Sequence, residues 1–97
     1  MNWVLITYDI VTDDKNGRKR LRRVAKVCER YGVRVQKSVF ECQGDDKTLQ
    51  QLRFELLDEI DDRYDSLRIY HMGHDISKHV ESFGVDVAIR FDQPLLF

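Results

Sequence analysis

Residues 3–10 read WVLITYDI, an apolar run rich in β-branched and aromatic residues and interrupted near its end by Asp9. Such a run predicts a buried strand. The polar residues 12–17, TDDKNG, predict a turn after it. Beyond this turn, apolar residues recur at helical spacing until Gly32, which predicts the end of a helix. These residues are Leu21, Val24, Ala25, Cys28 and Tyr31.

Residues 33–42 are extended, but their apolar alternation changes phase. Val33 and Val35 stand at odd positions, whereas Phe40 stands at an even one. Because side chains alternate across a strand with a period of two, the change predicts either a bulge or two short strands divided near Lys37 and Ser38.

The second half of the chain repeats the succession of helix and strand. Residues 44–46, GDD, open a second predicted helix. Strands are predicted over 67–72 and 85–91, and a helical turn within 76–84. The apolar face of the second helix is Leu49, Leu52, Leu56 and Ile60, and the helical turn would use Ile76, Val80 and Phe83.

Strands separated by two amphipathic helices in a short chain predict an α+β fold, the ferredoxin-like two-layer sandwich. It would have an antiparallel sheet with two helices on one face, plus an extra C-terminal strand. We expect one domain over residues 1–97, in which 85–97 form that strand and an apolar docking tail ending in PLLF.

The composition supports a single folded domain of 97 residues that are 42% hydrophobic and 34% charged. No apolar run approaches the roughly 18 residues of a membrane span. Residues 1–6 lack a basic leader, so we expect no signal peptide and a cytoplasmic protein. Cys28 and Cys42 fit no metal or disulfide spacing, and we expect Cys28 to be a core residue.

The net charge of −1 conceals an uneven distribution of charge. Residues 15–37 hold ten basic residues and one acid (+9), and the remainder holds six basic and sixteen acidic residues (−10). This distribution predicts either a surface that faces a polyanion or a helix face paired with the acidic half of the chain. Wrapped around a helix, the charges suit contact with phosphates rather than reading of bases. Arg18, Arg22, Lys26 and Arg30 recur every four residues, and Lys19, Arg20 and Arg23 lie further round the helix.

Asp9 is the sharpest candidate for chemistry, because it ends an apolar strand just before the basic segment. It is either a turn or cap residue or a magnesium ligand. Two copies of Asp9 across a two-fold axis would make an adequate magnesium site. Three histidines lie within nine residues in the second half of the chain. We expect them to be packed or exposed rather than metal ligands, because zinc spacing and cysteine partners are missing. They are His71, His74 and His79.

Four segments, taken together, resemble the CRISPR-associated Cas2 family, the small partner of the Cas1 integrase in spacer acquisition. They are 4–10 (VLITYDI), 20–26 (RLRRVAK), 34–41 (RVQKSVFE) and 65–70 (DSLRIY). The resemblance covers nearly the whole chain in order. The ending over 92–97, DQPLLF, is similar to that of the I-C subtype.

The resemblance implies a ferredoxin-like homodimer with a magnesium site at Asp9, in which manganese could substitute. It implies a metal-dependent endonuclease that acts on single-stranded RNA or double-stranded DNA. Tyr8, Arg34 and Phe40 match family positions beside the aspartate, so these three join Asp9 as candidate catalytic residues. Candidate nucleic-acid-binding residues are Arg18, Arg20, Arg22, Arg23 and Lys26.

A second hypothesis is a scaffold without catalysis, which binds duplex DNA and bridges dimers of the Cas1 integrase. In that case Asp9 would be structural. No second acid, His or Lys base near Asp9 is evident from the sequence. We expect the tail over 94–97 to dock on the other protomer, with integrase contact adjoining.

Overall fold

The structure is a computed structural model that describes residues 1–85. Its elements follow one another in the order βαββαβ. They are β1 (Asn2–Asp9), α1 (Lys15–Tyr31), β2 (Gly32–Gln36), β3 (Val39–Gly44), α2 (Asp46–Glu59) and β4 (Ser66–Gly73), followed by the short 3₁₀ helix η1 (Ile76–Lys78).

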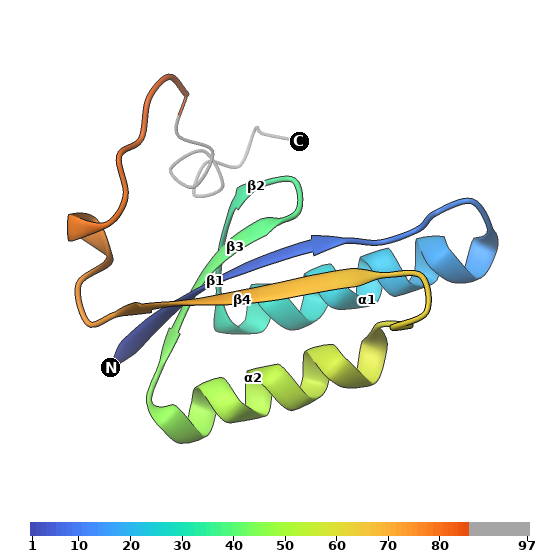
Figure 1. Cartoon of the computed structure of the whole chain (residues 1–97), viewed down its shortest axis with the longest axis horizontal. Coiled ribbons are helices and arrows are strands. Elements are labelled where there is room, and N and C mark those ends of the chain that lie inside the picture. The colour runs from blue at the N-terminus through green and yellow to red at the C-terminus, as the bar shows by residue number, and fades with distance from the viewer. Residues whose placement is uncertain (86–97) are drawn as a thin grey trace.

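The four strands form one antiparallel sheet in the order β2-β3-β1-β4. Both helices lie side by side on the same face of this sheet (Figure 1). The predicted ferredoxin-like sandwich is therefore confirmed. The expected strand over 85–91 and the tail over 94–97 lie, apart from Val85, outside the described residues.

The phase change in residues 33–42 marks a hairpin. β2 ends at Gln36 and β3 begins at Val39, so Lys37 and Ser38 divide two short strands as predicted. The pairing register also shifts between Arg34 and Gln36. Gly32 caps α1 and is the first residue of β2. A side chain does not fit there, because a Cβ atom would lie 2.0 Å from the backbone oxygen of Glu41.

The core lies between the helices and the face of the sheet that they cover, here called the inner face. Val4, Ile6 and Tyr8 point to it from β1, and Phe40 and Cys42 point to it from β3. The helices contribute further buried residues, which are Val24, Ala25, Val27, Cys28, Leu52 and Leu56. Cys28 is thus a core residue, as expected, although Val27 was missing from the predicted apolar stripe.

The other side of the sheet, here called the open face, carries no helix (Figure 1). Residues directly opposite each other in an antiparallel pair share a face, so the register assigns its members. They are Trp3, Leu5, Thr7 and Asp9 from β1, Val33 and Gln36 from β2, Val39, Glu41 and Gln43 from β3, and Ser66, Arg68 and Tyr70 from β4.

An aspartate caps each α-helix. The carboxylate of Asp14 accepts a hydrogen bond from the amide of Gly17 at 2.8 Å, and that of Asp45 accepts one from Thr48 at 2.7 Å. Both satisfy an amide that the first helical turn leaves free.

Within residues 1–85, no helix has the length and apolar character needed to cross a membrane.

The helical turn expected within 76–84 is shorter than predicted. Only η1 forms, and Asp75 caps it by accepting from the amide of Ser77 at 3.1 Å. The predicted use of Val80 and Phe83 is wrong, because both side chains are exposed rather than packed on the core.

Candidate active site

Asp9 is the last residue of β1 and lies on the open face. Its neighbours Tyr8 and Ile10 are both buried, so the backbone on either side of the carboxylate is anchored in the core. The carboxylate itself is exposed and has no ion pair or hydrogen bond with any residue in 1–85. An exposed and unpaired carboxylate on an anchored strand end suits a ligand from outside the chain.

Three of the four candidate catalytic residues form a cluster on the inner face. The rings of Tyr8 and Phe40 are stacked with their centroids 6.3 Å apart, and the Arg34 guanidinium lies 5.0 Å from the centre of the Phe40 ring. The hydroxyl of Tyr8 and Nε of Arg34 are buried and lack hydrogen-bond partners in the described part of the chain. Burial raises the pKa of Tyr8, against the opposing effect of the Arg34 charge.

The structure separates this cluster from Asp9. Tyr8 and Asp9 are consecutive in a strand and therefore point to opposite faces. Phe40 is fully buried in the core and its ring contacts Tyr8 and Arg34, so it offers no exposed surface to a substrate. The hairpin turn nevertheless remains beside the strand end, because the amide of Tyr8 donates to the carbonyl of Ser38 at 3.1 Å.

Arg68 is the positive charge that shares the open face with Asp9. Thr7 pairs with Arg68 and Asp9 pairs with Ser66, so Arg68 stands diagonally across from Asp9 on the neighbouring strand. Its guanidinium lies 5.4 Å from the centre of the Tyr70 ring. Sequence reasoning missed this residue, although the alternation of Leu67 and Ile69 with polar residues indicates the side to which Arg68 points.

The basic surface of α1 is only partly free. Arg18, Arg22, Arg23 and Lys26 are exposed and lack ion pairs within residues 1–85, so these candidates remain available to phosphates. Arg23 also borders a groove together with the acidic residues Asp58 and Glu59 of α2. Arg30 instead pairs with Glu55, which also accepts a hydrogen bond from Tyr31. Ion pairing with the acidic half of the chain thus occurs at Arg30, and contact of the exposed cations with a polyanion stays a prediction.

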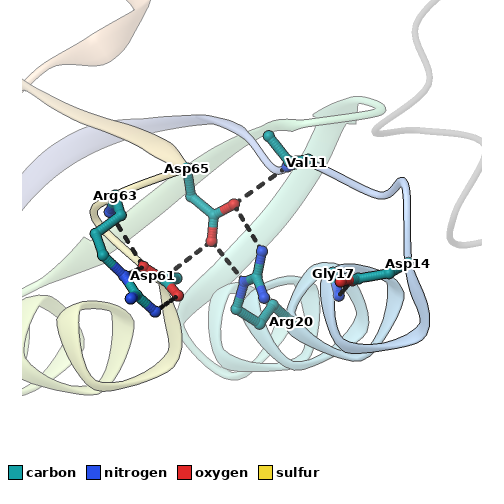
Figure 2. Close-up of polar contacts among 7 residues, drawn as sticks. All are labelled: Val11, Asp14, Gly17, Arg20, Asp61, Arg63 and Asp65. Carbon is teal, nitrogen blue, oxygen red and sulfur yellow. Dashed lines mark hydrogen bonds and ion pairs between the residues drawn. The ribbon is translucent and has the colours of Figure 1, made fainter.

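Arg20 differs from the other candidate phosphate-binding residues because Asp65 holds its guanidinium. The Asp65 carboxylate is fully buried and accepts from Nε of Arg20 at 2.7 Å and from Nη2 at 3.2 Å. It also accepts from the amides of Val11 at 3.1 Å and Asp61 at 2.8 Å (Figure 2). Burial alone would raise the pKa of Asp65, but these donors outweigh it and hold the pKa below its ordinary value.

Asp9 offers one carboxylate, the kind of oxygen donor that a magnesium ion prefers. Proteins usually hold this ion through one or two carboxylates, with water and substrate phosphate oxygens completing the shell. Within residues 1–85, no group of three or more His, Cys, Asp or Glu side chains could hold a metal ion. The three histidines are exposed, and His74 contacts the backbone oxygen of Met1 through Nδ1 at 3.1 Å.

Comparison with known proteins gives consistent matches. The family described as CRISPR associated protein Cas2 matches residues 1–79. A Moorella thermoacetica protein named CRISPR-associated endoribonuclease Cas2 1 is 48% identical over 94 residues, covering 97% of this chain and 98% of that protein. A Halalkalibacterium halodurans protein named CRISPR-associated endonuclease Cas2 is 50% identical over 94 residues, with the same coverage.

A solved structure agrees with these matches. The crystal structure of Streptococcus pyogenes Cas2 is 45% identical, with a TM-score of 0.75, and the match covers 84% of this chain and 99% of that one. The shared ferredoxin-like sheet, the family match and the high identity over almost the whole length lead to one conclusion. The chain belongs to the Cas2 family of CRISPR-associated proteins.

Proposed function

We propose that this chain is a Cas2 endonuclease of CRISPR adaptation, which works in the cytoplasm as a homodimer and cleaves RNA or double-stranded DNA with magnesium. One observation carries the proposal. The carboxylate of Asp9 is exposed, has no ion pair or hydrogen bond within residues 1–85, and stands between two buried neighbours. The names of the relatives support the reaction class, since they are an endoribonuclease and an endonuclease.

The open face supports the homodimer. It carries half-buried Trp3, Leu5 and Val39, together with Val33 and Tyr70, whose side chains are 46% and 41% exposed. An apolar sheet face that no helix covers favours packing against another protein surface, which would remove its apolar side chains from water. A second copy packed there by two-fold symmetry would bring two Asp9 carboxylates to one site, which is richer in ligands than one chain alone.

The residues of the chain divide the work of cleavage between them. Bound magnesium would supply activation of water and neutralisation of the charge that develops on the phosphate. Asp9 would hold the ion from a strand end that is anchored in the core, because its neighbours Tyr8 and Ile10 are buried. Arg68 on the same face would offset negative charge in the transition state, and Arg18 and Arg22 would attract the phosphate backbone.

Replacement of Asp9 tests this function directly. Asp9→Asn removes the charge and keeps the shape of the side chain, so cleavage with magnesium should fall by about 100-fold or more. The unfolding curve should not change, because the carboxylate is exposed and has no partner in the described part of the chain. EDTA should abolish cleavage by the unmodified chain, and manganese should restore it. Full activity of Asp9→Asn in the presence of EDTA would reject the proposal.

A second candidate function is the non-catalytic scaffold that binds DNA and bridges dimers of the Cas1 integrase. One observation favours it. The free cations of α1 lie over the inner face, whereas Asp9 lies on the open face. Nucleic acid that contacts the cations of α1 alone could therefore be held without reaching the carboxylate. Spacer acquisition that survives Asp9→Asn but is lost when Arg18 and Arg22 are both changed to Glu would favour the scaffold.

Assignment to the I-C subtype is part of the proposal and rests on the sequence alone. Residues 92–97, DQPLLF, support it, and residues 94–97 would dock on the partner protomer beside the integrase. Removal of residues 93–97 should then weaken dimer association in sedimentation equilibrium. Unchanged association together with intact integrase binding would leave the tail without either role.

A further inference from the structure

The loop of residues 10–14 joins Asp9 to the first turn of α1 and is fixed from two sides. Ile10 is buried in the core, and the amide of Val11 donates to Asp65 at 3.1 Å (Figure 2). On its other side the loop presses on α1, because a Cβ atom at Gly17 would lie 1.9 Å from the backbone oxygen of Val11. The two residues after Asp9 therefore have little freedom to move.

Asp65 connects this loop to two other parts of the molecule. Its carboxylate binds Arg20 in α1 through two hydrogen bonds and the amide of Asp61 after α2 through a third. The side chain of Asp65 is fully buried, and that of Arg20 is 17% exposed. A buried carboxylate with four donors is fully satisfied, and loss of its charge would leave several of these donors unpaired.

We propose that Asp65 is a positioning residue for Asp9, because it fixes the loop that directly follows the candidate metal ligand. The inference rests on the proposed function for its catalytic consequence and on the hydrogen bonds of Figure 2 for its structural part. Arg20 helps to fix the loop, because its guanidinium holds the Asp65 carboxylate. Its charge serves to hold Asp65 rather than to bind phosphate, which separates it from Arg18 and Arg22.

Two variants of the full chain weaken the hydrogen bonds between Asp65 and its partners. Asp65→Asn keeps the shape but loses the charge. Arg20→Lys keeps the positive charge, and with it any attraction for phosphate, but loses the planar fork that binds both oxygens. Glu55→Gln is the matched control. It weakens a different set of carboxylate contacts, those that join Glu55 of α2 to Arg30 and Tyr31 of α1.

The first measurement needs no activity. Amide hydrogen exchange of residues 10–14 should become at least about tenfold faster in Asp65→Asn and in Arg20→Lys, but should not change in Glu55→Gln. In calorimetry with Mn²⁺ alone, affinity should weaken in the two loop variants only. Should Asp65→Asn fail to fold, Arg20→Lys carries the test.

The second measurement separates positioning from substrate binding. kcat should fall about 10- to 100-fold in Asp65→Asn, since small displacements of a catalytic group are costly. KM for the nucleic acid should not change, because the free cations of α1 are untouched. Equal losses of kcat in Glu55→Gln, or exchange of residues 10–14 that stays unchanged in both loop variants, would overturn the proposal.

Failure of the proposed function would look different. The unmodified chain would then show no metal-dependent cleavage and no Mn²⁺ binding that depends on Asp9. In that case the exchange of residues 10–14 would still decide whether Asp65 orders the loop.

Discussion

The two faces of the sheet differ in what surrounds their polar groups. On the inner face, Arg34 and Tyr8 are packed against Phe40 beneath the helices. On the open face, Asp9 and Arg68 stand in solvent among half-buried apolar residues. The inner face thus uses its polar residues to hold the strand end, and the open face presents the charges that an outside ligand could meet.

This difference matters because adjacent residues in a strand serve different faces. Tyr8 and Asp9 are neighbours in sequence, yet only Asp9 faces solvent. Tyr8, Arg34 and Phe40 therefore lie on the other face of the sheet from Asp9, and a catalytic role for these three residues stays a prediction. These three residues would affect cleavage by holding β1 in place. Substitutions on the inner face should therefore change mainly stability, and substitutions on the open face should change mainly association or kcat.

The largest expected effect is on the inner face. Phe40→Ala should lower the free energy of unfolding by about 4 kcal/mol, because it leaves a cavity in a fully buried position. Phe54→Ala is the matched control, since Phe54 is 55% exposed on α2, and it should cost less than about 1 kcal/mol. Urea unfolding of both variants measures the difference. Similar losses in the two would contradict the description of Phe40 as a core residue.

The next effect concerns the open face as a dimer interface. Leu5→Asp should raise the dissociation constant of the homodimer at least about 100-fold, because it places a charge in the centre of the apolar surface. Leu57→Asp puts the same change on the 46% exposed Leu57 of α2 and should leave association intact. Sedimentation equilibrium distinguishes them. A dimer that tolerates Leu5→Asp would place the interface elsewhere.

A smaller effect links the loop after Asp9 to pH. The pKa of Asp65 is lowered in the folded state, so its stabilisation is present above the ordinary aspartate pKa of about 3.9 and is lost as the pH falls through the folded value. Unmodified chain and Asp65→Asn should differ by about 2 kcal/mol at neutral pH. This difference should shrink as urea unfolding is repeated at progressively lower pH. A gap that widens in acid would contradict the direction of the shift.

The smallest effect compares two arginines on opposite faces. Arg68→Gln should lower kcat about tenfold without changing stability, because Arg68 shares the open face with Asp9. Arg34→Gln should act mainly on the unfolding free energy, since its guanidinium packs on Phe40. Arg53→Gln, which also removes a guanidinium beside an aromatic ring, is the control on α2. A loss of kcat in Arg34→Gln with unchanged stability would instead support a direct catalytic role for Arg34.

Much of this arrangement could be predicted from the sequence. The apolar run over 3–10, the helical spacing and the phase change near Lys37 depend on local periodicity. They correctly predicted β1, both α-helices, β4 and a division of residues 33–42 into two short strands. The pairing register depends on contacts between distant segments, and so the place of Arg68 beside Asp9 was missed. The partner of Arg20 was missed for the same reason, because Asp65 lies 45 residues away.

The two cysteines make thiol chemistry a measure of folding in this chain. Cys28 and Cys42 are fully buried, and burial raises the pKa of each thiol to about 12. Reagents that attack thiolates should therefore modify the native protein only when its core opens. A cysteine introduced at an exposed position could then be labelled selectively, and the native pair would need no replacement.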